Sequence, residues 1–383
     1  MFPDFNIFST PLLVLVLQGL VLVGMLLNKA QSKKEISSFI LAILLLITCY
    51  HRTTYTIGFM GWYDSYRNTK INYYLIPLIL GIGPLIYLYI QSVGVKVFRL
   101  GKKELFHFLP LFVFVLFRII LFVYDWFQPD FEQTQNGVLM QWVIENLTPL
   151  IAVVFVLHLL IYLIFSFQLY YKVRSRLAHQ FSNTYQFELH WLRNFLFLFT
   201  FLFVYNILQM LTDRFIFELH WIQEWWFEFF SLLVVIYVGL KGYFTPIEHL
   251  PLLEPAVITV VNPTQNNTIN TDVDYQKQLE PVKTLVANEA LFLDSNLTLT
   301  KLSKKVKRPP SQLSMIINKG SGQNFNEFIN SYRIALVKEK LVDKKYAHLS
   351  ILAIALDCGF NSKATFNRVF KKLDGKAPSF YRE

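Results

Sequence analysis

The stretch ILAIALDCGFNSKATFNRVFKK, residues Ile351–Lys372, decides how this chain is interpreted. Apolar side chains in its first half recur at i, i+3, i+4 and i+7, which is the buried stripe of a short helix; these are Ile351, Ile354, Ala355 and Cys358. Gly359 follows, where a residue in the left-handed conformation ends such a helix. The pattern predicts a short helix that stops at a glycine turn.

The second half of this stretch predicts a basic helix. Asn361 or Ser362 can cap it, and its apolar face consists of Phe366, Val369 and Phe370. A helix, a tight glycine turn and a basic helix are typical of the helix-turn-helix, whose second helix enters the major groove of DNA. Lysines can bind phosphates, and arginine and asparagine have the fork and amide geometry that reads base edges. The side chains predicted to face outward are Lys363, Thr365, Asn367, Arg368, Lys371 and Lys372.

A weaker copy of the pattern lies upstream, in LTLTKLSKKVKRPPSQLSMIINKG. The inner stripe of its first helix is Leu299, Leu302 and Val306, and that of its second is Leu313, Ile316 and Ile317. This leaves Ser311, Gln312, Ser314, Met315 and Lys319 exposed for DNA contact. Between the two copies, NEFINSYRIALVKEKL is interpreted as a longer helix that joins them.

At these residues a family resemblance becomes specific. The stretch from about Tyr275 to Arg382 resembles the DNA-binding domain of AraC-type (arabinose-operon activator) bacterial regulators, most closely in FINSYRIALVKEKL and LSILAIALDCGFNSKATFNRVFKKLDGKAPSFYR. The resemblance implies two helix-turn-helix units whose recognition helices enter successive major grooves. The first unit departs from the family pattern, with Lys307 for the turn glycine and Pro309 for the capping serine. Pro310 can still occupy an early helical position.

The net charge supports a polyanionic partner for this region. Residues 276–383 contain 19 Lys+Arg and 9 Asp+Glu, so they carry the whole formal net charge of +10. An anionic lipid surface is the competing target. A membrane-surface helix, however, has a broad Trp/Phe/Leu face and no partner helix across a glycine turn. The charge and the pattern together favour double-stranded promoter DNA.

The rest of the chain is too apolar for an ordinary soluble globule, since the whole sequence is 54% hydrophobic and 16% charged. Seven runs are long enough to cross about 30 Å of hydrocarbon as helices. We therefore expect an all-α protein, a seven-transmembrane-helix bundle followed by two helix-turn-helix units joined by a linker helix. The membrane half resembles the multi-span sensor halves that some members of the family carry. The runs fall near residues 7–28, 37–59, 71–94, 104–124, 147–171, 191–211 and 222–243.

Basic residues in the connections predict the orientation. The first, third and fifth loops hold ten Lys and Arg, whereas the opposite side holds three, Arg67, Lys70 and Arg214. This asymmetry predicts an N-terminus outside and a C-terminal domain in the cytoplasm. The resemblance to bacterial regulators implies that the membrane is the cytoplasmic (inner) membrane of a bacterium. The ten are Lys29, Lys33, Lys34, Lys96, Arg99, Lys102, Lys103, Lys172, Arg174 and Arg176.

A change in amino-acid composition separates the two halves of the chain. The stretch PAVITVVNPTQNNTINTDVDYQ is rich in Asn, Thr and Pro and poor in charge, which is typical of a linker. We expect a membrane sensor domain at residues 1–248, a flexible linker at 249–275 and the DNA-binding domain at 276–383.

Polar side chains inside the predicted spans indicate a signal-binding site. Ionisable groups in lipid are costly unless they are paired or wetted, so they mark functional cavities. In the alternative interpretation, Arg52 and Arg118 extend to the outer headgroups and Glu228 pairs with one of them. The side chains expected at one depth near the outer face, where they could bind a small polar ligand, are His51, Arg52, Arg118, Asn206, Gln209 and Glu228.

These features favour a membrane-tethered transcription regulator. The alternative is a transporter or channel with a regulatory cytoplasmic tail, which inverted repeats or paired broken helices would favour. The sequence contains no HExxH, GxSxG or P-loop motif, so no catalytic residue, cofactor or metal is expected. The expected partners are promoter DNA, the lipid bilayer and a small polar ligand from the outer side; a homodimer is left open.

Overall fold

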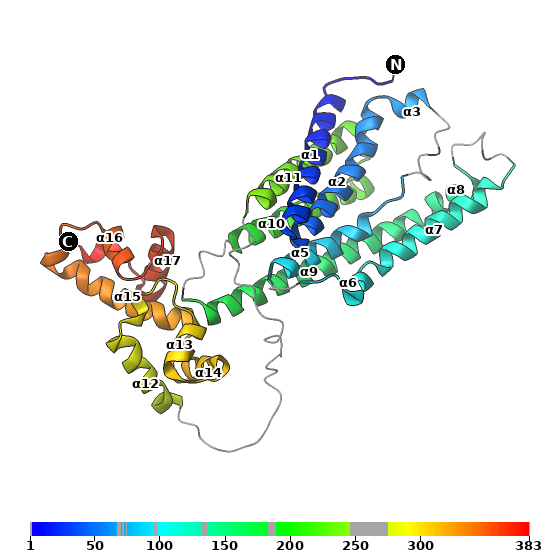
Figure 1. Cartoon of the computed structure of the whole chain (residues 1–383). Coiled ribbons are helices and arrows are strands. Elements are labelled where there is room, and N and C mark those ends of the chain that lie inside the picture. Colours follow the sequence, from blue (N-terminus) through cyan, green and yellow to red (C-terminus); the bar gives the residue numbers. More distant parts are fainter. Residues whose placement is uncertain are drawn as a thin grey trace. The chain divides into compact units, whose positions relative to one another are not determined.

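The computed structural model of the chain describes residues 2–66, 70, 73, 75–94, 98–129, 131, 136–182, 189–245 and 275–382. Within these ranges the regular structure is helical and contains no strand (Figure 1). The chain divides into two compact units. The first contains Met1–Tyr170 and His190–Ile258, and the second contains Tyr171–Leu189 and Thr259–Glu383. The predicted all-helical class is confirmed, while almost all of the predicted linker lies outside the described residues.

The first unit contains six helices that are long and apolar enough to cross a membrane, among the residues that the structure describes. These are α1 (Ser9–Lys33), α2 (Ile36–Phe59), α7 (Leu109–Trp126), α9 (Thr148–Gln180), α10 (Leu189–Phe215) and α11 (Trp221–Phe244). The shorter elements are α3 (Trp62–Ser65), η1 (Ile79–Gly81), α5 (Ile82–Gly94), α6 (Lys102–Phe106) and α8 (Val138–Asn146).

The third predicted span, 71–94, does not form one long helix. Its continuous helical part begins at η1 and continues in α5, which has 13 residues. Pro77 lies just before it in irregular backbone, because proline lacks the N–H that a helix interior requires. Together η1 and α5 cover Ile79–Gly94, which rises about 24 Å as a helix, less than the hydrocarbon thickness of about 30 Å. The count of seven spans therefore stays a prediction.

Glycines allow α1, α2 and α11 to approach closely. A Cβ added to Gly19 of α1 would lie 2.6 Å from Sγ of Cys49 in α2, and one added to Gly239 of α11 would lie 2.8 Å from a methyl of Leu22. Small residues at such crossings let backbones pack, which matters in lipid because no hydrophobic force drives helices together there. These three helices lie side by side in Figure 1.

The second unit consists of short helices around two apolar cores. In chain order they are α12 (Tyr275–Asn288), η5 (Leu291–Leu293), α13 (Leu299–Val306), α14 (Pro310–Ser321), α15 (Phe325–Val342), η6 (Lys344–Tyr346), α16 (Ile351–Asp357), α17 (Lys363–Asp374) and η7 (Pro378–Tyr381). The C-terminal end of α9 and the two residues after it also belong to this unit.

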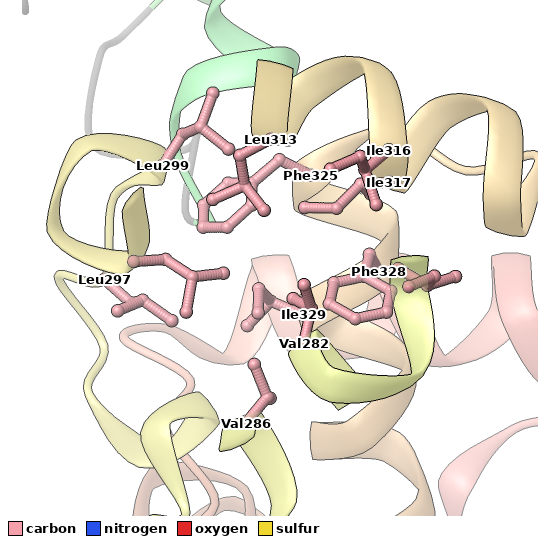
Figure 2. Packing of buried hydrophobic residues seen from close by; sticks show 12 residues of the cluster. Val282, Val286, Leu297, Leu299, Leu313, Ile316, Ile317, Phe325, Phe328 and Ile329 are labelled. Atoms are coloured by element: carbon pink, nitrogen blue, oxygen red, sulfur yellow. The ribbon is translucent and has the colours of Figure 1, made fainter. Parts of the chain in front are cut away.

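Helix α15 belongs to both cores, as expected of a joining helix. Its N-terminal half packs Phe325, Phe328 and Ile329 against α12, α13 and α14 (Figure 2). Its C-terminal half packs Ile334, Val337 and Leu341 against α16 and α17. Because each fully buried side chain of this size contributes about 1.5–3 kcal/mol, the two cores fix both helix pairs on one long helix.

Candidate functional site

The second helix pair, α16 and α17, forms as the sequence pattern predicts. Ser350 caps α16 by accepting a hydrogen bond from the N–H of Ala353 at 3.1 Å. Gly359 follows the helix with φ +92°, and Ser362, not Asn361, caps α17 through the N–H of Thr365 at 3.2 Å. The turn and the cap together set where the basic helix begins.

The outer face of α17 presents most of the predicted DNA contacts. Thr365 is the exception, because only 5% of it is exposed. It lies four residues before Val369 on the buried side of the helix, and its Oγ1 accepts a hydrogen bond from Oγ of Ser362 at 3.0 Å. The prediction that Thr365 faces outward is therefore wrong. The exposed set is Lys363, Asn367, Arg368, Lys371 and Lys372.

One of these cations already has a protein partner. Nζ of Lys372 lies 2.5 Å from Oε1 of Glu327 in α15, and this hydrogen bond holds the pKa of that carboxyl below its usual value. A phosphate must compete with the carboxylate for Lys372. Lys371 is therefore the better candidate for a phosphate contact on this helix.

The first helix pair, α13 and α14, keeps its shape despite its unusual turn. Lys307 adopts the left-handed conformation with φ 54°, and the N–H of Arg308 donates to the carbonyl of Ser303 at 3.1 Å. This conformation costs a lysine roughly 1–2 kcal/mol, a penalty that glycine avoids. Helix α14 begins at Pro310, which confirms that this proline occupies an early helical position.

The predicted contacts on α14 differ in exposure. Tyr275 of α12 lies beside two of them, with its hydroxyl 3.3 Å from Sδ of Met315 and its ring centroid 5.0 Å from Nζ of Lys319. Ser314 is half-buried, and the exposed residues are Ser311, Gln312, Met315 and Lys319. Helix α12 thus borders the surface that α14 offers.

The first unit contains a polar cavity of about 410 Å³. It lies near the C-terminal ends of α2 and α10 and the N-terminal end of α11. At its wall, Nη1 of Arg52 lies 2.5 Å from Oε2 of Glu228, which is only 2% exposed. The guanidinium also lies 4.8 Å from the ring centroid of Phe227. An ion pair this deeply buried is stable only when both partners are present.

Five of the six residues predicted for a signal site line this one cavity: His51, Arg52, Asn206, Gln209 and Glu228. They come from α2 and from the consecutive helices α10 and α11, which begin 130 or more residues after the end of α2. Arg118 is not among its lining residues and lies instead within electrostatic reach of Tyr50 and Tyr73. The grouping predicted from depth alone is thus found in the structure for five side chains and not for Arg118.

Sequence reasoning missed two further carboxylates of the cavity, Asp213 and Glu224. Glu224 stands four residues before Glu228, so helical spacing places both on one face of α11 and could have identified it. Oδ1 of Asp213 accepts a hydrogen bond from the N–H of Leu219 at 2.8 Å, which ties it to the loop before α11. Nε2 of His51 accepts one from the N–H of Leu78 at 3.1 Å, so that nitrogen carries no proton.

Comparisons with known proteins concern the C-terminal region. Residues 302–383 match the family described as a helix-turn-helix domain. The uncharacterized HTH-type transcriptional regulator YtdP of Bacillus subtilis is 29% identical over 112 residues, which are 29% of this chain and 14% of that protein. An uncharacterized HTH-type transcriptional regulator of Staphylococcus aureus (strain COL) is 36% identical over 92 residues, which are 24% of this chain and 12% of that protein.

A solved structure of a protein of unknown function from Listeria innocua is 27% identical to this chain. It aligns with a TM-score of 0.24 and covers 27% of this chain and 93% of its own. The chain spans only a small part of the curated relatives that it matches.

The C-terminal region is a helix-turn-helix domain, the class of DNA-binding module that its family match defines. It is of the AraC type, as the stretch Ile351–Lys372 indicated.

Proposed function

We propose that the protein is a membrane-anchored transcription regulator that binds promoter DNA through α14 and α17. The observation that carries this proposal is that one chain combines an AraC-type domain with six membrane-length helices. In this proposal, residues 276–383 form the DNA-binding domain, 1–248 the membrane sensor and 249–275 the linker. The recognition helices α14 and α17 enter successive major grooves and read bases through their exposed polar side chains.

The first prediction separates base readout from phosphate contact. Arg368→Ala is expected to weaken promoter binding by about 1–3 kcal/mol and to relax preference at one base position. Lys371→Ala is expected to weaken binding to all sequences alike and to reduce the slope of log affinity against log salt by about one. Promoter DNA is first identified by chromatin pull-down and sequencing. Its binding to the full-length protein in lipid nanodiscs is then measured for each variant. Unchanged binding in both variants would contradict the assignment of α17.

The second proposal concerns the membrane. The Lys and Arg asymmetry of the loops supports an outer N-terminus and a cytoplasmic DNA-binding domain, provided that the segment with η1 and α5 crosses the bilayer despite its short helix. Crossing would require the backbone before Ile79 to contribute to the span. Irregular backbone at membrane depth is tolerated where it is covered by protein.

The second prediction tests that segment directly. Alkaline phosphatase, which is active only outside the cytoplasm, is fused after Tyr66, after Leu100 or after Phe244. We expect activity after Tyr66 and none after the other two, because a crossing helix lies between the first two positions. A cytoplasmic reporter at the same positions should give the opposite pattern. Equal activity after Tyr66 and Leu100 would mean that α5 does not cross and that the chain has six spans.

We further propose that the cavity around Arg52 and Glu228 receives the signal. Its wall carries one guanidinium and three carboxylates, those of Asp213, Glu224 and Glu228. Since Arg52 is already paired with Glu228, the remaining carboxylates favour a ligand with a positive charge. The rings of Phe199, Phe203 and Phe227 would face its apolar part. A small organic cation with an apolar body is the chemical class that this lining fits.

A further inference from the structure

The C-terminal end of α9 packs within the DNA-binding unit. Residues 171–182, here called the α9 strap, come well before the C-terminal domain in the sequence. They nevertheless belong to the same compact unit as residues 259–383. Helix α9 runs without a break to Gln180, and Phe181 then pairs with Thr298 in an antiparallel bridge. Thr298 is the N-cap of α13, so the strap meets the first helix pair at the start of its first helix.

Ser182 at the end of the strap is 1% exposed. It is bound by Asn326, Asn330 and Arg333 of α15, which together are called the Arg333 socket. Its carbonyl accepts hydrogen bonds from Nδ2 of Asn326 at 2.7 Å and Nδ2 of Asn330 at 3.3 Å. Its hydroxyl donates to the carbonyl of Leu297 at 2.8 Å and accepts from Nη2 of Arg333 at 3.1 Å. Asn326, Asn330 and Arg333 are spaced i, i+4 and i+7, so α15 presents them on one face.

The buried guanidinium of Arg333 needs the hydrogen-bond acceptors that Ser182 supplies. Only 1% of this side chain is exposed, and burial lowers its pKa to about 10. The carbonyls of Phe292 and Asp294 accept from its Nε at 2.7 Å and its Nη2 at 2.9 Å. Ser182 supplies further acceptors to both terminal nitrogens. A buried guanidinium has five N–H donors and is costly when they lack acceptors, so the strap completes the solvation of Arg333.

The strap also borders the second helix pair. Arg174 and Ala178 line a cavity of about 320 Å³ together with Arg368 and Lys372 of α17. On the other side, Nδ1 of His179 lies 3.1 Å from Nδ2 of Asn318 in α14. The same twelve residues therefore touch or face both proposed recognition helices.

We propose that the α9 strap is a docking element that seats Ser182 in the Arg333 socket and so links the membrane-length helix α9 directly to both helix pairs. The DNA-binding domain is then held by two connections, the strap and the linker. Because α9 is one continuous helix, a shift of its apolar part is passed to α13, α14 and α15 by packed contacts. The docking does not depend on what ligand the cavity binds or which promoter the domain reads.

The docking is tested by a disulfide in the full-length protein. Directly opposed residues of an antiparallel bridge have Cβ atoms about 4.5–5.5 Å apart, close to the separation that a disulfide needs. Phe181→Cys is combined with Thr298→Cys, and a protease site is inserted after Asn266. After mild oxidation in membrane vesicles and cleavage, we expect the two fragments to stay joined until a reductant is added.

Two comparisons decide the result. Phe181→Cys combined with Lys344→Cys, an exposed position outside the socket, should leave the fragments separate. Adding Asn326→Ala to the variant with Phe181→Cys and Thr298→Cys should slow cross-linking about fivefold, since it removes hydrogen bonds to the strap. Cross-linking no faster than in the Lys344→Cys control, or unaffected by Asn326→Ala, would overturn the docking. Failure to find promoters in a chromatin pull-down would overturn the proposed function and leave this result unchanged.

Discussion

Gly359→Ala is expected to abolish DNA binding by disrupting the turn of the second helix pair. Gly359 has φ +92°, which costs a residue with a Cβ about 1–2 kcal/mol. An added Cβ would also lie 2.6 Å from the carbonyl oxygen of Phe292 and 3.0 Å from that of Leu293. These are backbone atoms at η5, so they cannot rotate away as the end of a side chain could. Overpacking of this kind adds about 1–3 kcal/mol.

Gly375→Ala is the matched control for this prediction. Gly375 ends α17 with φ +80°, but a Cβ there would meet nothing within 4 Å. The control therefore carries the backbone cost alone, about 1–2 kcal/mol. The measurement is thermal unfolding of the DNA-binding domain in the purified full-length protein, followed by binding to promoter DNA. Equal losses in the two variants would show that the contact with Phe292 and Leu293 does not restrict this turn.

The same glycine shows how far the sequence could predict this domain. The apolar stripe and the turn glycine are local signals, and they predicted both helices of the second pair. Their burial pattern failed only at Thr365, because the capping bond from Ser362 and its position before Val369 turn that side chain inward. The close approach of Gly359 to Phe292 could not be predicted, since no local pattern relates positions 67 residues apart.

In the first unit, hydropathy predicted the long helices, and counting along them grouped five of the polar side chains that line the cavity. The five side chains were assigned a common depth by counting along separate helices. They line one cavity around Arg52 and Glu228 because these helices pack side by side. Arg118 did not, since depth carries no information about which way a helix faces. The socket of Ser182 is harder still to predict, because the polar residues of α15 that bind it resemble an ordinary solvated helix face.

A buried polar contact that the sequence did not indicate lies at Asp125. This residue is fully buried at the end of α7, where Oδ2 accepts hydrogen bonds from the hydroxyl of Tyr73 at 2.7 Å and the N–H of Met140 at 2.9 Å. Oδ1 accepts another from the N–H of Leu139 at 2.8 Å. A carboxylate can thus satisfy the free N–H groups at the start of α8. In the sequence it is only a polar residue at the end of an apolar run.

Arg52→Met is expected to destabilise the first unit strongly. The substitution leaves the carboxylate of Glu228 buried without the guanidinium that lies 2.5 Å from it. Removing one partner of a buried ion pair typically costs about 3–5 kcal/mol. Arg52→Met combined with Glu228→Gln removes both charges and should restore most of that loss. Thermal unfolding of the purified protein in lipid nanodiscs measures both variants, and a double variant no more stable than the single one would contradict the pairing.

The double variant also tests whether the cavity receives the signal, because it keeps the fold while changing the lining. The test uses a growth condition that alters output of the target promoter in the wild type. In cells with the double variant, the same condition should leave promoter output unaltered, although the protein is present at its normal level. Arg118→Met, which lies outside the cavity lining, should keep the wild-type response. Glu224→Gln should weaken the response without affecting stability, because it removes a carboxylate from the lining and leaves the ion pair intact. If the double variant is stable and still responds as the wild type does, the signal is received elsewhere and Arg52 and Glu228 serve the fold alone.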